Sequence, residues 1–463
     1  MKPVLSVFFV CALAFCACKK QNEWLDAKRQ ITDNVPETLK DFQAILDNSI
    51  IMNAGYPTLG LLGADNYYFP DAAVQVINAM DRNSYLWNKD IFGVEASIEY
   101  NTAYNIIASA NVVLEGVAAI DIATDKLAEY NNVKGQALFF RSMLFSELAA
   151  VFCKHYNAST AANDLGICIR TKSDVHHLEP RSSIEQTYKL IIDDLKLAAS
   201  LLPVTAVYKT RPCKSAAFAL LARTYLQMGS YTNAKSFSDS ALTYSARLLD
   251  FNDEIISITK PYRFPDFKLE NPEIVFYATG YPHAGIAPSA SFNRSFVDSL
   301  LFQSYDDNDL RKTYFFATDN VGRAKYRGGY TGNDLIFDGI GINEVFLIRA
   351  ECNARMNNIV SATDDLNKLL KNRYKKGAYT DFVATDGDVA LVKILEERRK
   401  ELPFTGQIRW QDLRRLNKEP RFARVLKRLY NGTLYEIQPN DKRYIYPFPQ
   451  NEIDLAGIQQ NER

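Results

Sequence analysis

The chain has 463 residues, of which 47% are hydrophobic and 23% charged, a composition typical of a folded protein with a large buried core and not of a disordered chain. Its 54 Lys and Arg residues are balanced by 54 Asp and Glu residues. The chain as a whole therefore lacks the surplus positive charge that nucleic-acid binding requires, and we predict no nucleic-acid partner.

The N-terminus has the features of a secretory signal peptide over residues 1–17. Its apolar run over 4–14 is too short to span a membrane. Cys18 follows Ala17, and a small residue before a cysteine is typical of a bacterial lipoprotein signal, although Phe15 stands where such signals usually carry leucine. We predict lipidation at Cys18, since several acyl chains on one cysteine give a stable anchor. The alternative is a plain signal peptide on a soluble periplasmic or secreted protein.

The cysteines of the remaining chain are isolated from one another: Cys153, Cys168, Cys213 and Cys352. They form no C-x-x-C pair and have no histidines at metal-ligand spacing, so we interpret them as buried thiols and predict no metal site. A disulfide between Cys153 and Cys168 stays open as an alternative, because an exported protein meets an oxidising compartment.

The first half of the chain is predicted to be mainly helical. Apolar residues recur at helical spacing over 97–117, 133–152 and 182–203. In the third segment Ser182 is the expected N-cap, Glu185 closes a capping box, and a proline ends the helix.

Two distant segments, 216–242 and 343–370, resemble each other. A shift of 128 residues places Gly229 opposite Asn357 and superimposes a phenylalanine, two alanines and a methionine. Each segment reads as a helix, a tight turn and a second helix, which matches the tetratricopeptide pattern. Glycine or asparagine at the turn suits the left-handed conformation that follows a helix. Two unrelated helical hairpins are the alternative interpretation.

Between these hairpins the sequence changes character. Residues 250–342 are rich in proline and glycine and predict loops with short strands, and a second irregular region covers 59–73 and 85–92. Long irregular segments on a helical scaffold often carry binding surfaces. We find no catalytic motif among the four histidines, no G-x-S-x-G and no metal-binding loop, so we predict no catalytic residues and no cofactor.

The segment ERRKELPFTGQIRWQDLRR, residues 397–415, gathers five arginines around a phenylalanine and a tryptophan. Because the overall charge is balanced, we interpret it as internal structure in preference to a binding site. Phe404 and Trp410 are expected to anchor it in the core. The arginines, among them Arg398, Arg399, Arg414 and Arg415, are expected to bridge neighbouring helices through carboxylates or carbonyls.

Several stretches together resemble the SusD/RagB family of outer-membrane nutrient-binding lipoproteins. They occur in this order: CKKQNEWLD, NVPETLKDFQAILD, GADNYYFPDA, YLWNKDIF, PRSSIEQTYKLIIDDLKLAASLLP, the repeat 216–242, NEVFLIRAECNARMNN, ERRKELPFTGQIRWQDLRR and YPFPQNEIDLAGIQQN. No single motif is decisive, and the resemblance is carried by their order and spacing over most of the chain.

The resemblance implies a mainly α fold, a SusD-like α-α superhelix, with tetratricopeptide-like hairpins on one side and a loop-rich ligand-binding face. It implies an N-terminal region over 18–260 and a C-terminal region over 261–463, packed together as one domain. Proteins of this family are not enzymes. They capture oligosaccharide, or peptide in some members, for a SusC-like TonB-dependent transporter, which the repeats are implied to face. The implied location is the outer membrane, lipid-anchored at Cys18 and facing the cell surface.

A sugar receptor needs flat rings to stack on and polar groups at the ring edges. The stretch DNYYFPD supplies both, and the middle loops add further tyrosines. The candidate ligand-binding residues are Asp65, Asn66, Tyr67, Tyr68, Phe69, Trp87, Tyr281 and Tyr330. For each ring the alternative is core packing, which we favour most at Trp87.

Two other classes of protein stay open at this point. One is a periplasmic or surface tetratricopeptide scaffold that binds only protein, which buried tyrosines and the absence of a small ligand would favour. The other is a helical glycoside hydrolase, which would require turnover of an oligosaccharide.

Overall fold

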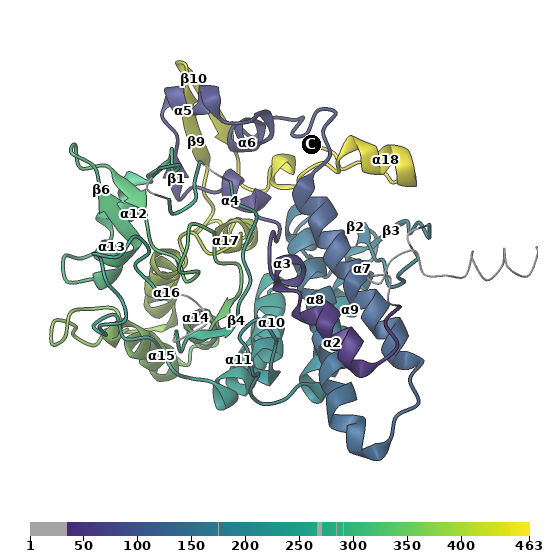
Figure 1. Ribbon diagram of the computed structural model, residues 1–463. Coiled ribbons are helices and arrows are strands. Elements are labelled where there is room, and N and C mark those ends of the chain that lie inside the picture. Colours follow the sequence, from purple (N-terminus) through teal and green to yellow (C-terminus); the bar gives the residue numbers. More distant parts are fainter. Residues whose placement is uncertain (1–34, 175, 266–270, 284, 290) are drawn as a thin grey trace, which may run out of the picture.

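The computed structural model describes residues 35–174, 176–265, 271–283, 285–289 and 291–463. These residues form a mainly helical structure with short strands, as predicted (Figure 1). The helices are α2 Leu39–Asp47, α3 Ser49–Met52, α4 Leu59–Gly63, α5 Asp71–Val76, α6 Ala79–Tyr85, α7 Ile98–Ala118, α8 Leu127–Phe152, α9 Ile184–Leu201, α10 Lys214–Gln227, α11 Tyr231–Tyr244, α12 Ser299–Gln303, α13 Leu310–Phe315, α14 Ile342–Arg355, α15 Ile359–Lys371, α16 Gly387–Glu401, α17 Ile408–Leu416 and α18 Gln450–Ala456.

The strands are short and pair as separate two-stranded antiparallel sheets: β1 with β5, β2 with β3, β4 with β8, β6 with β7 and β9 with β10. Their bounds are β1 Tyr67–Tyr68, β2 Leu165–Cys168, β3 Arg181–Ser183, β4 Ile274–Phe276, β5 Phe296–Val297, β6 Phe316–Thr318, β7 Ala324–Tyr326, β8 Ile340–Gly341, β9 Leu426–Tyr430 and β10 Thr433–Ile437. The expectation of short strands within 250–342 is confirmed, whereas region 59–73 contains the helices α4 and the start of α5 in place of a continuous loop.

The long helices pack in chain order. Helices α7, α8 and α9 lie together on one side of the molecule, α10 and α11 in the middle, and α14, α15 and α16 beyond them (Figure 1). Helix α8 is central, since every residue over 135–145 is buried. One cluster of buried apolar residues runs from Phe42 near the start of the described chain to Ile458 near its end.

Helix α9 begins one residue later than predicted. Its N-cap is Ser183, whose hydroxyl accepts from the backbone N–H of Gln186 at 3.1 Å, while the Gln186 side chain accepts from the Ser183 N–H at 2.9 Å. The predicted cap Ser182 instead donates its hydroxyl to the Ile167 carbonyl at 2.9 Å. The capping box therefore exists, but pairing of β3 with β2 uses Ser182 and shifts the helix start.

The two predicted helical hairpins are confirmed as α10–α11 and α14–α15. The turn residues Gly229 and Asn357 have φ angles of 73° and 59°, the left-handed conformation expected after a helix. Helix α14 packs on both α11 and α15, so the two hairpins are neighbours in space.

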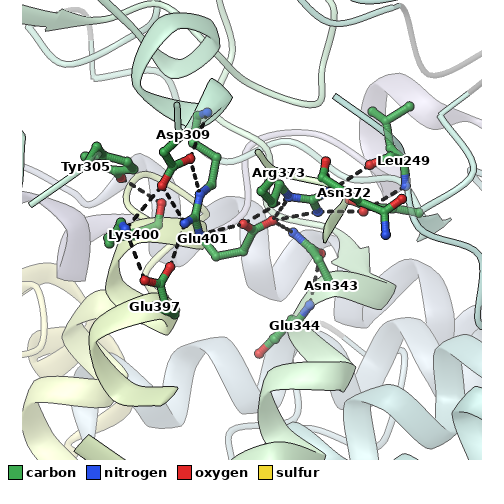
Figure 2. Close-up of polar contacts among 12 residues, drawn as sticks. Leu249, Tyr305, Asp309, Asn343, Glu344, Asn372, Arg373, Glu397, Lys400 and Glu401 are labelled. Carbon is green, nitrogen blue, oxygen red and sulfur yellow. Dashed lines mark hydrogen bonds and ion pairs between the residues drawn. The ribbon is translucent and has the colours of Figure 1, made fainter. Parts of the chain in front are cut away.

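The arginine-rich segment 397–415 is internal structure, as expected. Arg311 donates to Asp309 at 2.7 Å, to Glu397 at 2.5 Å and to Glu401 at 3.2 Å. Glu401 also accepts from Arg373 at 2.8 Å, and these side chains are fully buried. Figure 2 shows Glu397 and Glu401 beside Asp309 and Arg373. Each buried charge has an opposite partner, so the network fixes α16 against the loops before α13 and after α15.

Three of the four arginines named in the prediction join helices as expected, whereas Arg399 contacts Asp65, Asn66 and Asp298 outside the helices. Arg398 donates to Asp412 at 2.8 Å, and Arg415 donates to both oxygens of Glu351 at 2.5 and 2.8 Å. Arg414 donates to backbone carbonyls at the end of α8. These contacts tie α14, α16, α17 and α8 together.

The predictions for the cysteines and the N-terminus have different outcomes. The structure shows Cys153, Cys168, Cys213 and Cys352 as buried free thiols, so the alternative of a Cys153–Cys168 disulfide is wrong. Cys18 and the signal peptide lie outside the described residues. Among the described residues, no helix combines the length and the apolar character needed to cross a bilayer.

Candidate functional site

The candidate site begins where α4 rests on Trp410 of α17. Trp410 is fully buried. A Cβ atom at Gly63 would lie 2.7 Å from the Trp410 ring, so only glycine permits this close approach. The contact positions the chain that follows α4, which carries the first five candidate residues.

The two neighbouring tyrosines of β1 point in opposite directions, as side chains on a strand do. Tyr67 is 3% exposed, and its hydroxyl donates to the Leu62 carbonyl at 2.8 Å. Tyr68 is half-buried, and its ring stacks on Phe296 of β5 with 5.8 Å between centroids. Tyr68 is therefore the tyrosine of this pair with ring surface available to a ligand.

Arg428 of β9 is enclosed by aromatic rings. Its guanidinium lies 3.7 Å from the Tyr85 ring centroid, 4.4 Å from that of Trp87 and 5.4 Å from that of Tyr67. It also donates to the Ala64 carbonyl at 2.5 Å. Cation–π and hydrogen-bond contacts thus attach the β9–β10 hairpin to the chain around β1.

Asp65 and Asn66 are held by arginines of the 397–415 segment. Asp65 accepts two hydrogen bonds from Arg409, at 2.6 and 2.8 Å. Asn66 is buried, accepts from Arg399 at 2.9 Å and donates to the Pro403 carbonyl at 2.6 Å. Burial alone would raise the pKa of Asp65, but Arg399 and Arg409 outweigh it and hold the pKa well below its usual range.

These elements surround an open pocket of about 580 Å³. Five of the eight predicted residues line it: Asp65, Tyr67, Tyr68, Phe69 and Trp87. The side chains of Tyr67, Phe69 and Trp87 are nearly enclosed, and Trp87 donates its Nε1–H to the Gly63 carbonyl at 3.0 Å. The core packing favoured for Trp87 is confirmed, and these three rings support the wall and present little surface of their own.

The remaining three predicted residues lie elsewhere. Asn66 does not line the pocket, because its amide is used between α16 and β1. Tyr330 is buried and donates to Glu273 at 2.7 Å, so its ring belongs to the core beside the Arg373 network. Tyr281 is half-buried and lies beside His283, with 5.2 Å between ring centroids, away from this pocket. Ligand binding by these three residues stays a prediction, and the burial of Asn66 and Tyr330 agrees better with core packing.

Sequence reasoning missed one wall of the pocket. It comprises Leu300 of α12 and the residues 424–429 that lead into and form β9. The hairpin had a local signal, since Asn431-Gly432 lies between alternating apolar residues, and φ angles of 47° and 73° suit the tight turn that this dipeptide favours. No local signal placed that hairpin beside β1, because the contact joins segments about 360 positions apart.

No metal-binding group is evident at the pocket. Among the described residues, no three or more His, Cys, Asp or Glu side chains are arranged to hold a metal ion. The pocket wall offers a half-buried tyrosine ring, guanidinium groups, carboxylates and apolar side chains.

A mainly helical fold with a loop-built, aromatic and basic pocket is typical of a helical binding protein, and comparison with known proteins identifies its family. A family model described as "Starch-binding associating with outer membrane" matches residues 23–226, and the SusD family model matches residues 340–462. Both are models of SusD-type proteins and together they match well over half of the chain, so the chain belongs to the SusD/RagB family.

Individual relatives are distant in sequence. SusD-like protein P2 of Formosa agariphila is 24% identical in an alignment of 415 positions that covers 76% of this chain and 77% of that protein. A SusD superfamily protein of Bacteroides thetaiotaomicron is similar in structure, with a TM-score of 0.73, 22% identity, and coverage of 92% of this chain and 100% of the other. A putative sugar binding protein of Bacteroides vulgatus has a TM-score of 0.71 and 21% identity, with coverage of 93% and 99%. These structural similarities support the fold.

Proposed function

We propose that this protein is a non-catalytic outer-membrane lipoprotein that captures an oligosaccharide, or a peptide, and passes it to a SusC-like TonB-dependent transporter. The observation that carries the proposal is the pocket beside β1, which is lined by the half-buried ring of Tyr68 and by charged side chains. Membership of a family described as starch-binding supports a carbohydrate as the ligand.

The pocket suits a sugar in size and chemistry. A volume of about 580 Å³ accommodates a short oligosaccharide. Sugar rings present C–H faces to aromatic and apolar groups and hydroxyls to polar ones. Tyr68 and Leu300 supply the first kind of contact, and Asp298 and Arg424 supply the second.

Delivery to a transporter needs a second free surface. The pocket lies at the β1 and β9 end of the molecule, away from α7, α8 and α9 (Figure 1). The repeats α10–α11 and α14–α15 also contribute no residue to the pocket wall, and we propose that these repeats face the transporter. Lipidation at Cys18 would hold the protein at the outer membrane, facing the cell surface, beside that partner.

The ligand half of the proposal is tested with oligosaccharide binding. Tyr68→Ala should weaken binding by about tenfold, the loss expected for one stacking ring. Tyr208→Ala is the matched control, because Tyr208 is an exposed tyrosine that does not line the pocket. Equal affinities for the wild type and Tyr68→Ala would show that the ligand does not bind in this pocket.

The transporter half is tested by gentle purification of the full-length protein from its native outer membrane. A TonB-dependent barrel should be recovered in stoichiometric amount, and Cys18→Ala should reduce that recovery by releasing the anchor. Recovery of the protein alone, under conditions that preserve known barrel complexes, would contradict the transporter role and favour a protein-binding scaffold.

A further inference from the structure

The pocket beside β1 is one half of a longer groove. A second cavity of about 580 Å³ lies between α12, α16, α17 and the segment after α17. The two cavities share Leu300, Arg399 and Arg424 as wall residues. Leu300 is 74% exposed, so it forms a lip at the junction and does not close it. A ligand longer than one pocket can therefore pass the junction.

The groove is basic although the chain as a whole is neutral. Its acidic wall residues are Asp65, Asp298, Glu396 and Glu397. Its basic wall residues are twice as many: Arg399, Arg409, Arg421, Arg424 and Arg428 with Lys393, Lys400 and Lys427. Local charge of one sign in a concave surface raises the concentration of oppositely charged ligands there.

Most of these cations are already engaged within the protein. Arg409 contacts Asp65 at 2.6 Å, and Lys400 contacts Glu397 at 3.0 Å. Arg399 is shared between Asp298 at 3.2 Å and Asp65 at 3.4 Å. Such pairs fix the wall but leave little capacity for a ligand.

Arg424 differs from these cations. It is exposed at the junction, and its backbone N–H is bound by Asn417 at 3.1 Å, which fixes the main chain beneath it. Within the described part of the chain its guanidinium has no hydrogen bond and no ion pair. The nearby carboxylate of Asp65 is already occupied by Arg409.

Two further guanidiniums and two carboxylates act on Arg399 at this point. Burial lowers the pKa of Arg399, Asp65 and Asp298 raise it, and the neighbouring guanidiniums of Arg409 and Arg424 lower it. Like charges gathered without enough counter-charge are relieved when an anion binds between them.

We infer that the joined groove selects an anionic oligosaccharide, whose carboxylate or sulfate group is bound by Arg424 at the junction while its sugar rings lie against Tyr68 and Leu300. This inference rests on the proposed function and specifies its ligand class. Guanidinium presents paired N–H donors that match the two oxygens of a carboxylate or sulfate. Leu429 of β9, 65% exposed, extends the apolar surface along the wall.

The test uses the full-length lipidated protein in detergent on an array of neutral, uronate-containing and sulfated oligosaccharides, together with acidic peptides. Binding should be confined to the anionic oligosaccharides and should weaken as salt rises. Arg424→Gln should reduce affinity for the bound anionic glycan by about tenfold or more, as expected for a lost charged hydrogen bond. Arg247→Gln is the matched control, since Arg247 is exposed, unpaired among the described residues and outside the groove.

The outcomes separate this inference from the function on which it rests. Preference for uronates or for sulfates alone identifies the anionic group and supports the inference. Tight binding of neutral oligosaccharides that Arg424→Gln leaves unchanged would overturn the inference and keep glycan capture. Preference for acidic peptides would overturn the inference and keep the capture of a peptide. Binding of neither oligosaccharides nor peptides would overturn both. Unchanged thermal unfolding of Arg424→Gln establishes that a lost affinity is not a lost fold.

Discussion

Tyr67 and Tyr68 are adjacent on one two-residue strand, yet Tyr67 is enclosed with its hydroxyl on the Leu62 carbonyl, whereas Tyr68 is half-buried and stacks on Phe296. Pairing of β1 with β5 sets this alternation, because Tyr68 lies opposite Phe296 and Tyr67 opposite Val297. The tyrosine pair that the sequence offered as two ligand contacts is therefore divided between core and surface.

Alanine substitutions at these two positions should separate stability from binding. Tyr67→Ala should lower the free energy of unfolding by about 3–5 kcal/mol, because it empties a buried aromatic site. Tyr68→Ala should lower it by less than about 1 kcal/mol and should act on ligand affinity. Denaturant unfolding and oligosaccharide binding, measured on both variants, check this. Similar stability losses in both would show that Tyr68 is also a core residue.

The buried network around Arg311 should be essential for the fold. Arg311→Met leaves Asp309 and Glu397 buried without their main partner. The substitution should therefore lower the free energy of unfolding by about 3–5 kcal/mol. Lys312→Met is a control at the next position, because Lys312 pairs with the exposed Asp307 and should cost at most about 1 kcal/mol. Thermal unfolding of the two variants makes the comparison, and equal effects would refute a structural role for the network.

His283 should make the free energy of unfolding fall as the pH rises from about 6.5 to about 10. Burial lowers its pKa, but Asp81 at 3.0 Å and Glu99 at 3.2 Å outweigh burial and raise the pKa of His283 to about 10. The folded state then keeps a proton that the unfolded state loses near pH 6.5. The contribution of this proton to the free energy of unfolding is fully present below about pH 6.5. It falls by up to about 1.4 kcal/mol per pH unit as the pH rises toward 10.

The measurement is chemical unfolding from pH 6 to pH 10 for the wild type and His283→Gln. The substitution should lower stability most at the acidic end, so the two curves should converge with rising pH. Parallel curves would show that His283 carries the same charge in the folded and unfolded states.

We propose that the regions 18–260 and 261–463 unfold as one unit. Arg223 of α10 donates to Glu344 of α14 at 2.7 Å with both side chains buried, which joins the two regions through charge as well as apolar packing. Calorimetry should show one transition, and Arg223→Met should move all of it to lower temperature. Two transitions, of which the substitution shifts only one, would establish separate domains.

The sequence by itself determined the helical hairpins, their turns and the internal role of the arginine-rich segment. Hairpins depend on periodicity and on single residues such as Gly229 and Asn357, whose left-handed turns are local properties of the chain. Phe404 and Trp410 are buried as expected. Large apolar rings are usually buried, and the charged residues around these two pair with one another inside the protein.

Only the tertiary structure decided which residues form the groove. Tyr330 looked like a loop aromatic but is buried against Glu273, and Asn66 is taken up by Arg399 and Pro403. Arg424 gains its place from contacts between segments that are hundreds of residues apart. Whether a polar or aromatic side chain faces solvent depends on which distant segment covers its other side, and neither periodicity nor composition encodes that choice.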